Sequence, residues 1–112
     1  MSAKNKLAAY RSAILTVLEK HRDQDAEDVM SELITDREHD HYQLVNVGWQ
    51  NDRRIYGCVL HLDILNNKIW IQHNGTEFDI AHELVEAGID KQDIVLGFHS
   101  PFKRQFTGFA IH

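Results

Sequence analysis

Apolar side chains recur at steps of three and four residues along the start of the chain. Together with one histidine they are Leu7, Tyr10, Ile14, Val17, Leu18 and His21, and the charged residues fall largely elsewhere around the same helix. This spacing predicts an amphipathic helix with one buried side. We expect the helix to end within the polar run at residues 23–25.

From residue 41 the period of the apolar positions changes to two. Residues 41–49, 54–65 and 68–74 are rich in Val, Ile, Tyr and Trp, which is typical of β-strands. Asn66 and Asn67 tolerate positive φ, so they can close a tight hairpin. Residues 29–36 fit either a further strand or a second helix, and we favour the strand. The sequence therefore predicts an antiparallel meander of three to four strands.

The hairpin and a turn near residues 50–53 assign each side chain of the meander to a face, because successive strand residues alternate. The face expected to form the core carries Val45, Val47, Trp49, Tyr56, Cys58, Leu60, Leu62, Ile64, Ile69 and Ile71. The opposite face carries Tyr42, Leu44, Asn46, Ile55, Val59, His61, Asp63, Trp70 and Gln72. Its mixture of aromatic and polar groups suits contact with water or with another protein.

A second helix is expected near residues 77–87. Thr76 can cap its start, with Asp79 three residues later, and Gly88 can end it. The buried stripe of this helix would be Ile80, Ala81, Leu84 and Val85. Asp90 can cap a further short turn, after which glycines and the only proline make the tail irregular. Helices and an antiparallel sheet together indicate an α+β fold.

Composition and charge limit the classes of protein to consider. With 112 residues, 43% hydrophobic and 26% charged, the chain fits a single globular domain. A formal net charge of −5 disfavours wrapping of a DNA duplex by charge alone. We expect the single cysteine, Cys58, to be a small buried residue in a reducing compartment. No signal peptide or membrane span is evident, so we expect a cytoplasmic protein.

The tail at residues 97–112 combines aromatic rings with positive charge. Phenylalanines stand at positions 98, 102 and 106, and Lys103 and Arg104 lie between the last two. Such a segment suits docking to a partner protein, and a similar pattern is found in proteins that bind single-stranded nucleic acid. The alternative is that the rings close the core and the cations lie at its rim.

Eight histidines raise the question of a metal site, because neutral imidazole is a common zinc ligand. His39 and His41 lie on one side only if that stretch is extended, and no cysteine pair or clear third ligand accompanies them. We expect a solvated turn there. His82 and Glu83 begin a zinc-protease helix motif, but Glu86 stands where a second histidine is required. We therefore expect His82 and Glu83 on the solvent face of a helix.

His61 and Asp63 alternate onto the same sheet face, where the carboxylate could orient or charge the imidazole. Tyr42 and Trp70 are expected beside them. No activated serine or cysteine accompanies this pair, since Cys58 is expected on the other face, and nucleophilic catalysis therefore lacks its nucleophile. A structural or interface role is favoured.

Five strings of residues include low-frequency types such as Trp and His. They are DHYQL from Asp40, VGW from Val47, RIYGC from Arg54, KIWIQ from Lys68 and GFHSPFKRQFTGFA from Gly97. These strings closely resemble the XisI family, and the resemblance covers nearly the whole chain from about Tyr10 onward. Strings of this length are far more specific than a short motif.

The resemblance implies a protein of the fdxN element excision controlling type, found in nitrogen-fixing photosynthetic bacteria. Members of the family are associated with programmed removal of a DNA element by the site-specific recombinase XisF, together with a companion protein, XisH. The resemblance implies a compact α+β fold. It brings no enzymatic activity and no catalytic, cofactor or metal residue to transfer to this chain.

These observations and the resemblance lead to the hypothesis of a non-enzymatic accessory protein that binds an XisH-like companion, with the XisF recombinase or its DNA complex as a further candidate partner and a homo-oligomer as a candidate assembly. The expected contacts on the tail are Phe102, Lys103, Arg104 and Phe106. The expected contacts on a second surface are Tyr42, His61, Asp63 and Trp70. The alternative is a small nucleic-acid-binding regulator that uses Arg53, Arg54, Lys103 and Arg104. An enzyme based on His61 and Asp63, or on a histidine-bound metal, is the third hypothesis.

Overall fold

The computed structural model describes residues 3–22 and 28–112. The elements, in chain order, are α1 (Ala3–Lys20), β1 (Val29–Asp36), β2 (His41–Gln50), β3 (Arg53–Leu65), β4 (Lys68–Asn74), α2 (Ile80–Glu86), a 3-10 turn (Lys91–Asp93), β5 (Ile94–Leu96) and α3 (Pro101–Arg104). The predicted α+β class is confirmed. The expected helix end at residues 23–25 lies outside the described residues, and α1 itself ends at Lys20.

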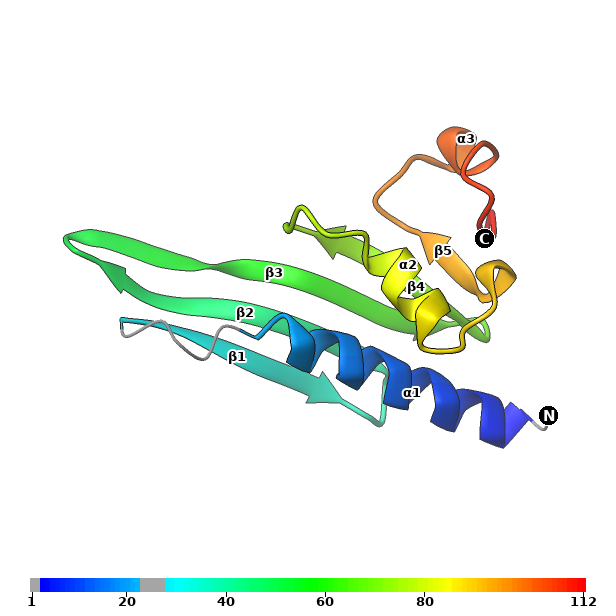
Figure 1. The fold of residues 1–112 in the computed structure, drawn as a ribbon, viewed down its shortest axis with the longest axis horizontal. Coiled ribbons are helices and arrows are strands. Elements are labelled where there is room, and N and C mark those ends of the chain that lie inside the picture. Colours follow the sequence, from blue (N-terminus) through cyan, green and yellow to red (C-terminus); the bar gives the residue numbers. More distant parts are fainter. Residues whose placement is uncertain (1–2, 23–27) are drawn as a thin grey trace.

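A five-stranded sheet in the order β1-β2-β3-β4-β5 forms the centre of the fold. The first four strands form the predicted antiparallel meander, and residues 29–36 form a strand, not a helix. The fifth strand was not predicted: it is short and pairs parallel to β4. The β2–β3 hairpin projects past the end of α1 (Figure 1).

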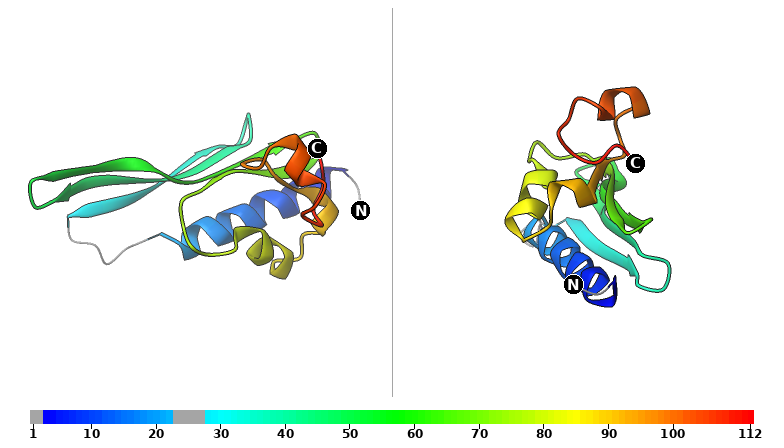
Figure 2. Two further views of the ribbon diagram at one scale, coloured as in Figure 1. Left: turned by 90° about the horizontal axis from the view of Figure 1, so that it is seen from above. Right: turned by 90° about the vertical axis from the view of Figure 1, so that its right-hand side faces the viewer.

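The two longer helices lie on the same side of the sheet (Figure 2). Ile14 and Leu18 of α1 and Leu84 of α2 are fully buried against sheet residues. The sheet residues in this core cluster are Tyr42, Leu44, Leu60, Leu62, Ile64, Ile69, Ile71 and Ile94. Burying each large aliphatic side chain contributes about 1.5–3 kcal/mol, so this layer is the main source of stability. The predicted buried side of the first helix is confirmed.

A register shift in the β2–β3 pair divides the face that the sequence assigned to the core. Leu44 pairs with Leu60, but the next residue, Val45, pairs with Cys58, which leaves Val59 as an extra residue in β3. Such a bulge exchanges the two faces of a strand relative to its partner. The prediction is therefore right for the residues from Leu60 onward.

The bulge makes the prediction wrong for the part of the hairpin on its other side. Val45, Val47, Trp49, Tyr56 and Cys58 share the face opposite α1 and α2, which we call the open face. Val45 is nevertheless buried on this face, at 7% exposed, outside the main core cluster. Tyr56 is 72% exposed and Trp49 is 52% exposed. Cys58 is also exposed, contrary to expectation.

Asparagines lie in the turns of two of the three hairpins, β2–β3 and β3–β4. Asn66 and Asn67 have φ values of 52° and 58°, and Leu65 pairs with Lys68 as predicted. Asn51, with φ 56°, lies in the turn between β2 and β3. These turns are compatible with short connections because asparagine adopts the left-handed region at low cost.

The second helix begins later than predicted. Asp79 is its N-cap, and Asp79 Oδ1 accepts a hydrogen bond from His82 N at 3.0 Å. Thr76 was expected to be the cap, but its hydroxyl donates to Asn74 Oδ1 at 2.6 Å in the preceding turn. Gly88, with φ 100°, follows the helix end as predicted. Asp90 caps the 3-10 turn, also as predicted.

Glu83 does not lie on the solvent face, contrary to expectation. Its carboxylate is 2.8 Å from His21 Nε2 and 3.3 Å from Lys20 Nζ, and it joins the two helices. His82 does face solvent, where its Nε2 lies 2.8 Å from Glu86 Oε1. Among the described residues, no helix is long and apolar enough to cross a membrane.

Candidate functional site

Exposed apolar side chains gather on the open face of the sheet. Tyr56 pairs with Val47, and Val47 pairs in turn with Met30 of β1. Met30 is 64% exposed. Trp49 lies two residues further along β2 on the same face. Contiguous exposed apolar groups of this kind are typical of interaction surfaces.

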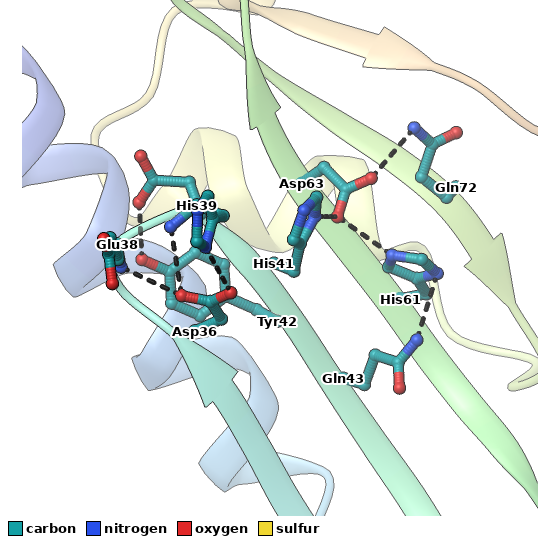
Figure 3. A network of polar contacts seen from close by, with 10 residues as sticks. Asp36, Glu38, His39, His41, Tyr42, Gln43, His61, Asp63 and Gln72 are labelled. Atoms are coloured by element: carbon teal, nitrogen blue, oxygen red, sulfur yellow. Dashed lines mark hydrogen bonds and ion pairs between the residues drawn. The ribbon is translucent and has the colours of Figure 1, made fainter.

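A polar cluster lies nearer the other end of the same face, on β2, β3 and β4 (Figure 3). Asp63 Oδ1 is 2.9 Å from His41 Nδ1 and 2.9 Å from His61 Nε2. Asp63 Oδ2 accepts from Gln72 Nε2 at 3.2 Å. Gln43 Nε2 lies 3.4 Å from His61 Nδ1. The carboxylate is thus the centre of a network that connects three strands.

The electrostatics of this cluster favour an ionised carboxylate. Burial by itself would raise the pKa of Asp63, but the hydrogen bonds from His41 and His61 outweigh it and lower the pKa below its usual value. The same interaction with Asp63 raises the pKa of His41. The cluster can therefore orient two imidazoles, and it favours the charged form of His41. Its described hydrogen bonds include no hydroxyl or thiol that could act as a nucleophile.

The β-bulge assembles this cluster. A regular ladder counted from the β2–β3 turn would place His41 opposite Leu62. The extra residue, Val59, moves His41 opposite Asp63 and Gln43 opposite His61. The sequence predicted that His61 and Asp63 share a face, which is confirmed, but it did not predict that His41 joins them. No residue pattern in the chain marks the position of the bulge.

Tyr42 lies on the other side of the sheet from this cluster, contrary to expectation. It is fully buried in the core, and its hydroxyl donates to Asp40 Oδ1 at 2.8 Å. Arg11 donates to both oxygens of Asp40, at 2.9 Å and 3.1 Å. Burial raises the pKa of Tyr42 to about 12. Tyr42 therefore belongs to the link between α1 and the β1–β2 turn, and no partner can reach it in this fold.

An aromatic pair projects from the tail. Phe102 is 68% exposed and Phe106 is 72% exposed, and their ring centroids are 5.4 Å apart in an edge-to-face arrangement. Lys103, between them in sequence, is exposed too. Ser100 caps the short helix α3 that carries these side chains, and Pro101 occupies its first turn. The tail was expected to be irregular, so this helix is a correction.

Arg104 faces the sheet instead of the solvent. Its Nε donates to the His99 carbonyl at 3.0 Å, and its guanidinium lies 5.1 Å from the ring centre of Trp70. Trp70 is half-buried beneath it, and Trp70 Nε1 is buried with no hydrogen-bond partner among the described residues. Arg104 and Trp70 therefore hold the tail against β4, whereas Phe102, Lys103 and Phe106 remain accessible.

The basic residues considered for nucleic-acid binding do not form one patch. Arg53 and Arg54 lie at the tip of the β2–β3 hairpin, and Lys103 and Arg104 lie in α3 at the opposite end of the molecule (Figures 1 and 2). Arg54 is 5.3 Å from the ring centre of Trp49.

Comparison with known protein families identifies the family of this chain. The family model described as XisI protein matches residues 4–111. The chain belongs to the XisI family. This agrees with the resemblance carried by the five sequence strings. A search of curated proteins finds no match.

Two solved structures of XisI proteins share the fold along their whole length. A XisI-like protein from Anabaena variabilis is 40% identical, with a TM-score of 0.83, and the match covers 99% of this chain and 100% of that one. The fdxN element excision controlling factor XisI from Anabaena variabilis is 38% identical, with a TM-score of 0.82, and the match covers 96% and 99% of the two chains.

Proposed function

We propose that this chain is a non-enzymatic accessory protein that controls excision of a DNA element, in concert with an XisH-like companion and the recombinase. The similarity to the fdxN element excision controlling factor supports a role in excision control. The cytoplasm is the expected place of action, since such a protein must meet chromosomal DNA or the proteins that recombine it.

The observation that carries the proposed binding role is the exposed aromatic pair of the tail. Phe102 and Phe106 expose large rings beside the cation of Lys103, on a segment that Arg104 fixes to the sheet. Rigid aromatic anchors beside a charge are typical of interface hot spots, because they bury a large area at a low cost in conformational entropy. The open sheet face, with Met30 and Tyr56, is the second contact surface of the proposal.

The test is copurification with a coexpressed XisH-like protein. Phe102→Ser combined with Phe106→Ser should weaken the complex by about tenfold or more, as loss of hot-spot rings does. Phe78→Ser is the matched control, because Phe78 is also an exposed phenylalanine but lies outside the tail. Equal binding by both variants would remove the tail from the interface, and no complex with the wild-type chain would remove the companion from the proposal.

Direct DNA binding is the competing function, and salt separates it from protein binding. Association through phosphate contacts weakens steeply as salt rises, whereas a largely apolar interface changes little. Fluorescence anisotropy with labelled element-end DNA, measured at low and high salt, should show no specific complex for the isolated chain. Tight binding that is abolished by Arg53→Glu would favour the nucleic-acid-binding regulator instead.

A further inference from the structure

Three side chains of the polar cluster bring metal-binding atoms close together. His41 Nδ1, His61 Nε2 and one carboxylate oxygen of Asp63 all lie within 4.8 Å of one another. This is the one such group of three found among the described residues. Other histidines that contact a carboxylate, such as His82 with Glu86, offer only two ligands.

The separations suit a transition metal ion after small movements. A tetrahedral ion bound at about 2.0–2.2 Å holds its ligand atoms roughly 3.3 Å apart. Both imidazole nitrogens now lie 2.9 Å from Asp63 Oδ1, so each would move away from that oxygen by a few tenths of an ångström. The two nitrogens lie within 4.8 Å of each other, and side-chain rotation would bring them to the same spacing. Two imidazoles and a carboxylate form a donor set that zinc and similar ions accept.

The backbone holds these ligands in place. His41 pairs directly with Asp63 across β2 and β3, and His61 is two residues from Asp63 in the same strand. All three positions lie within paired strands, which are more rigid than a loop. The site therefore does not depend on the closing of a flexible segment.

Two glutamines occupy the positions of supporting partners. Gln72 donates to Asp63 Oδ2 at 3.2 Å, which leaves Oδ1 directed to the histidines. The Gln43 amide lies 3.4 Å from His61 Nδ1, the ring nitrogen that points away from the cluster. Metal-binding histidines commonly donate from that second nitrogen, and the amide oxygen of Gln43 can accept this hydrogen bond after rotation of the amide.

We propose that His41, His61 and Asp63 bind one divalent transition metal ion of the zinc class on the open face of the sheet. The His41 side chain is 58% exposed, so an ion enters from solvent. Three protein ligands leave a coordination position for water or for a donor atom from a bound partner. This site goes beyond the proposed role in excision control, and neither depends on the other.

The test is titration of the untagged, chelator-treated protein with Zn²⁺ in competition with a chromophoric chelator, and with Co²⁺ followed by visible absorption. We expect one ion per chain and an intense Co²⁺ band typical of four-coordination. His41→Gln should weaken binding by at least about tenfold, and this exposed position keeps the fold. Asp63→Asn should weaken binding further, and Gln72→Leu should weaken it about tenfold through the supporting hydrogen bond.

The matched control is His82→Gln, which removes an exposed histidine that also contacts a carboxylate. It should leave the affinity and the Co²⁺ spectrum unchanged. The proposal is overturned if the wild-type chain binds no stoichiometric ion, or if His41→Gln, shown to be folded by circular dichroism, binds as tightly as wild type. A loss of affinity in His82→Gln equal to that in His41→Gln would also overturn it.

Discussion

The carboxylate of Asp40 joins the first helix to the β1–β2 turn through charged hydrogen bonds. Arg11 donates to both oxygens, and the hydroxyl of Tyr42 donates to one of them. The hydrogen bond from Arg11 is the main reason that the pKa of Asp40 is below its usual value. The unfolded chain therefore takes up a proton at Asp40 at a higher pH than the folded protein does.

This difference predicts a pH-dependent contribution to stability. It is fully present above the unfolded pKa of about 4, and it is lost as the pH falls through the lowered folded pKa. Arg11→Met should reduce the free energy of unfolding at pH 7, and this deficit should be smaller at about pH 3, where part of the contribution of Asp40 is lost. Urea unfolding at both pH values measures it.

Arg37→Met is the control for that measurement, because it removes a positive charge from an exposed position in the β1–β2 turn. Its effect should be small at both pH values. An Arg11→Met deficit that is the same at pH 7 and pH 3 would show that packing, not the charge on Asp40, accounts for the loss.

At the scale of the elements, the extra residue in β3 decides which side chains are accessible. The bulge at Val59 directs Leu60 and Leu62 toward the helices but leaves Cys58 and Tyr56 on the open face. Strict alternation without a bulge would bury all four side chains together. The apolar half of the open face and the His41–Asp63 pair both result from this single irregularity.

The bulge predicts opposite outcomes for two apolar residues of the same strand. Leu62→Ala should destabilise the protein by about 2–5 kcal/mol, since it leaves a cavity in the core. Tyr56→Ser should change stability by less than about 0.5–1 kcal/mol, because the ring is already in water. Chemical denaturation of both variants gives the comparison. Similar large losses in both would mean that Tyr56 is buried and that β3 has no bulge.

At the scale of the whole molecule, the C-terminal tail that follows β5 packs back against the sheet. Ala110 forms a bridge with Val95, and Arg104 lies over Trp70. Gly97 permits a close approach, since a Cβ there would lie 2.6 Å from Gln72 Oε1 and 3.2 Å from Trp70 Cε3. The tail thus covers Trp70, while α3 itself lies away from α1 (Figure 2).

This arrangement predicts that Arg104 controls the attachment of the tail. Arg104→Ala should make the tail several-fold more sensitive to limited proteolysis and shift Trp70 fluorescence to longer wavelength in a Trp49→Phe background, because the indole gains contact with water. Lys103→Ala, the neighbouring exposed cation, should change neither property. If the two alanine variants behave alike, Arg104 does not hold the tail.

The sequence was sufficient for those parts of the fold that depend on local chemistry. The amphipathic spacing of Ile14 and Leu18 predicted the first helix, and the asparagine pair predicted the hairpin register of Leu65 with Lys68. The short strand β5 escaped prediction because three residues carry too little periodicity. The exposed aromatic pair was visible in sequence, but the separate role of Arg104 was not.

The chain by itself determined its family, its two longer helices and its four long strands, because those depend on residue types and on spacing between near neighbours. Only the tertiary structure decided that Tyr42 lies in the core, that Tyr56 is exposed and that His41 meets Asp63. The reason is physical: one extra residue in a ladder reverses every side chain beyond it, and the position of that residue is set by the packing of the whole sheet against the helices.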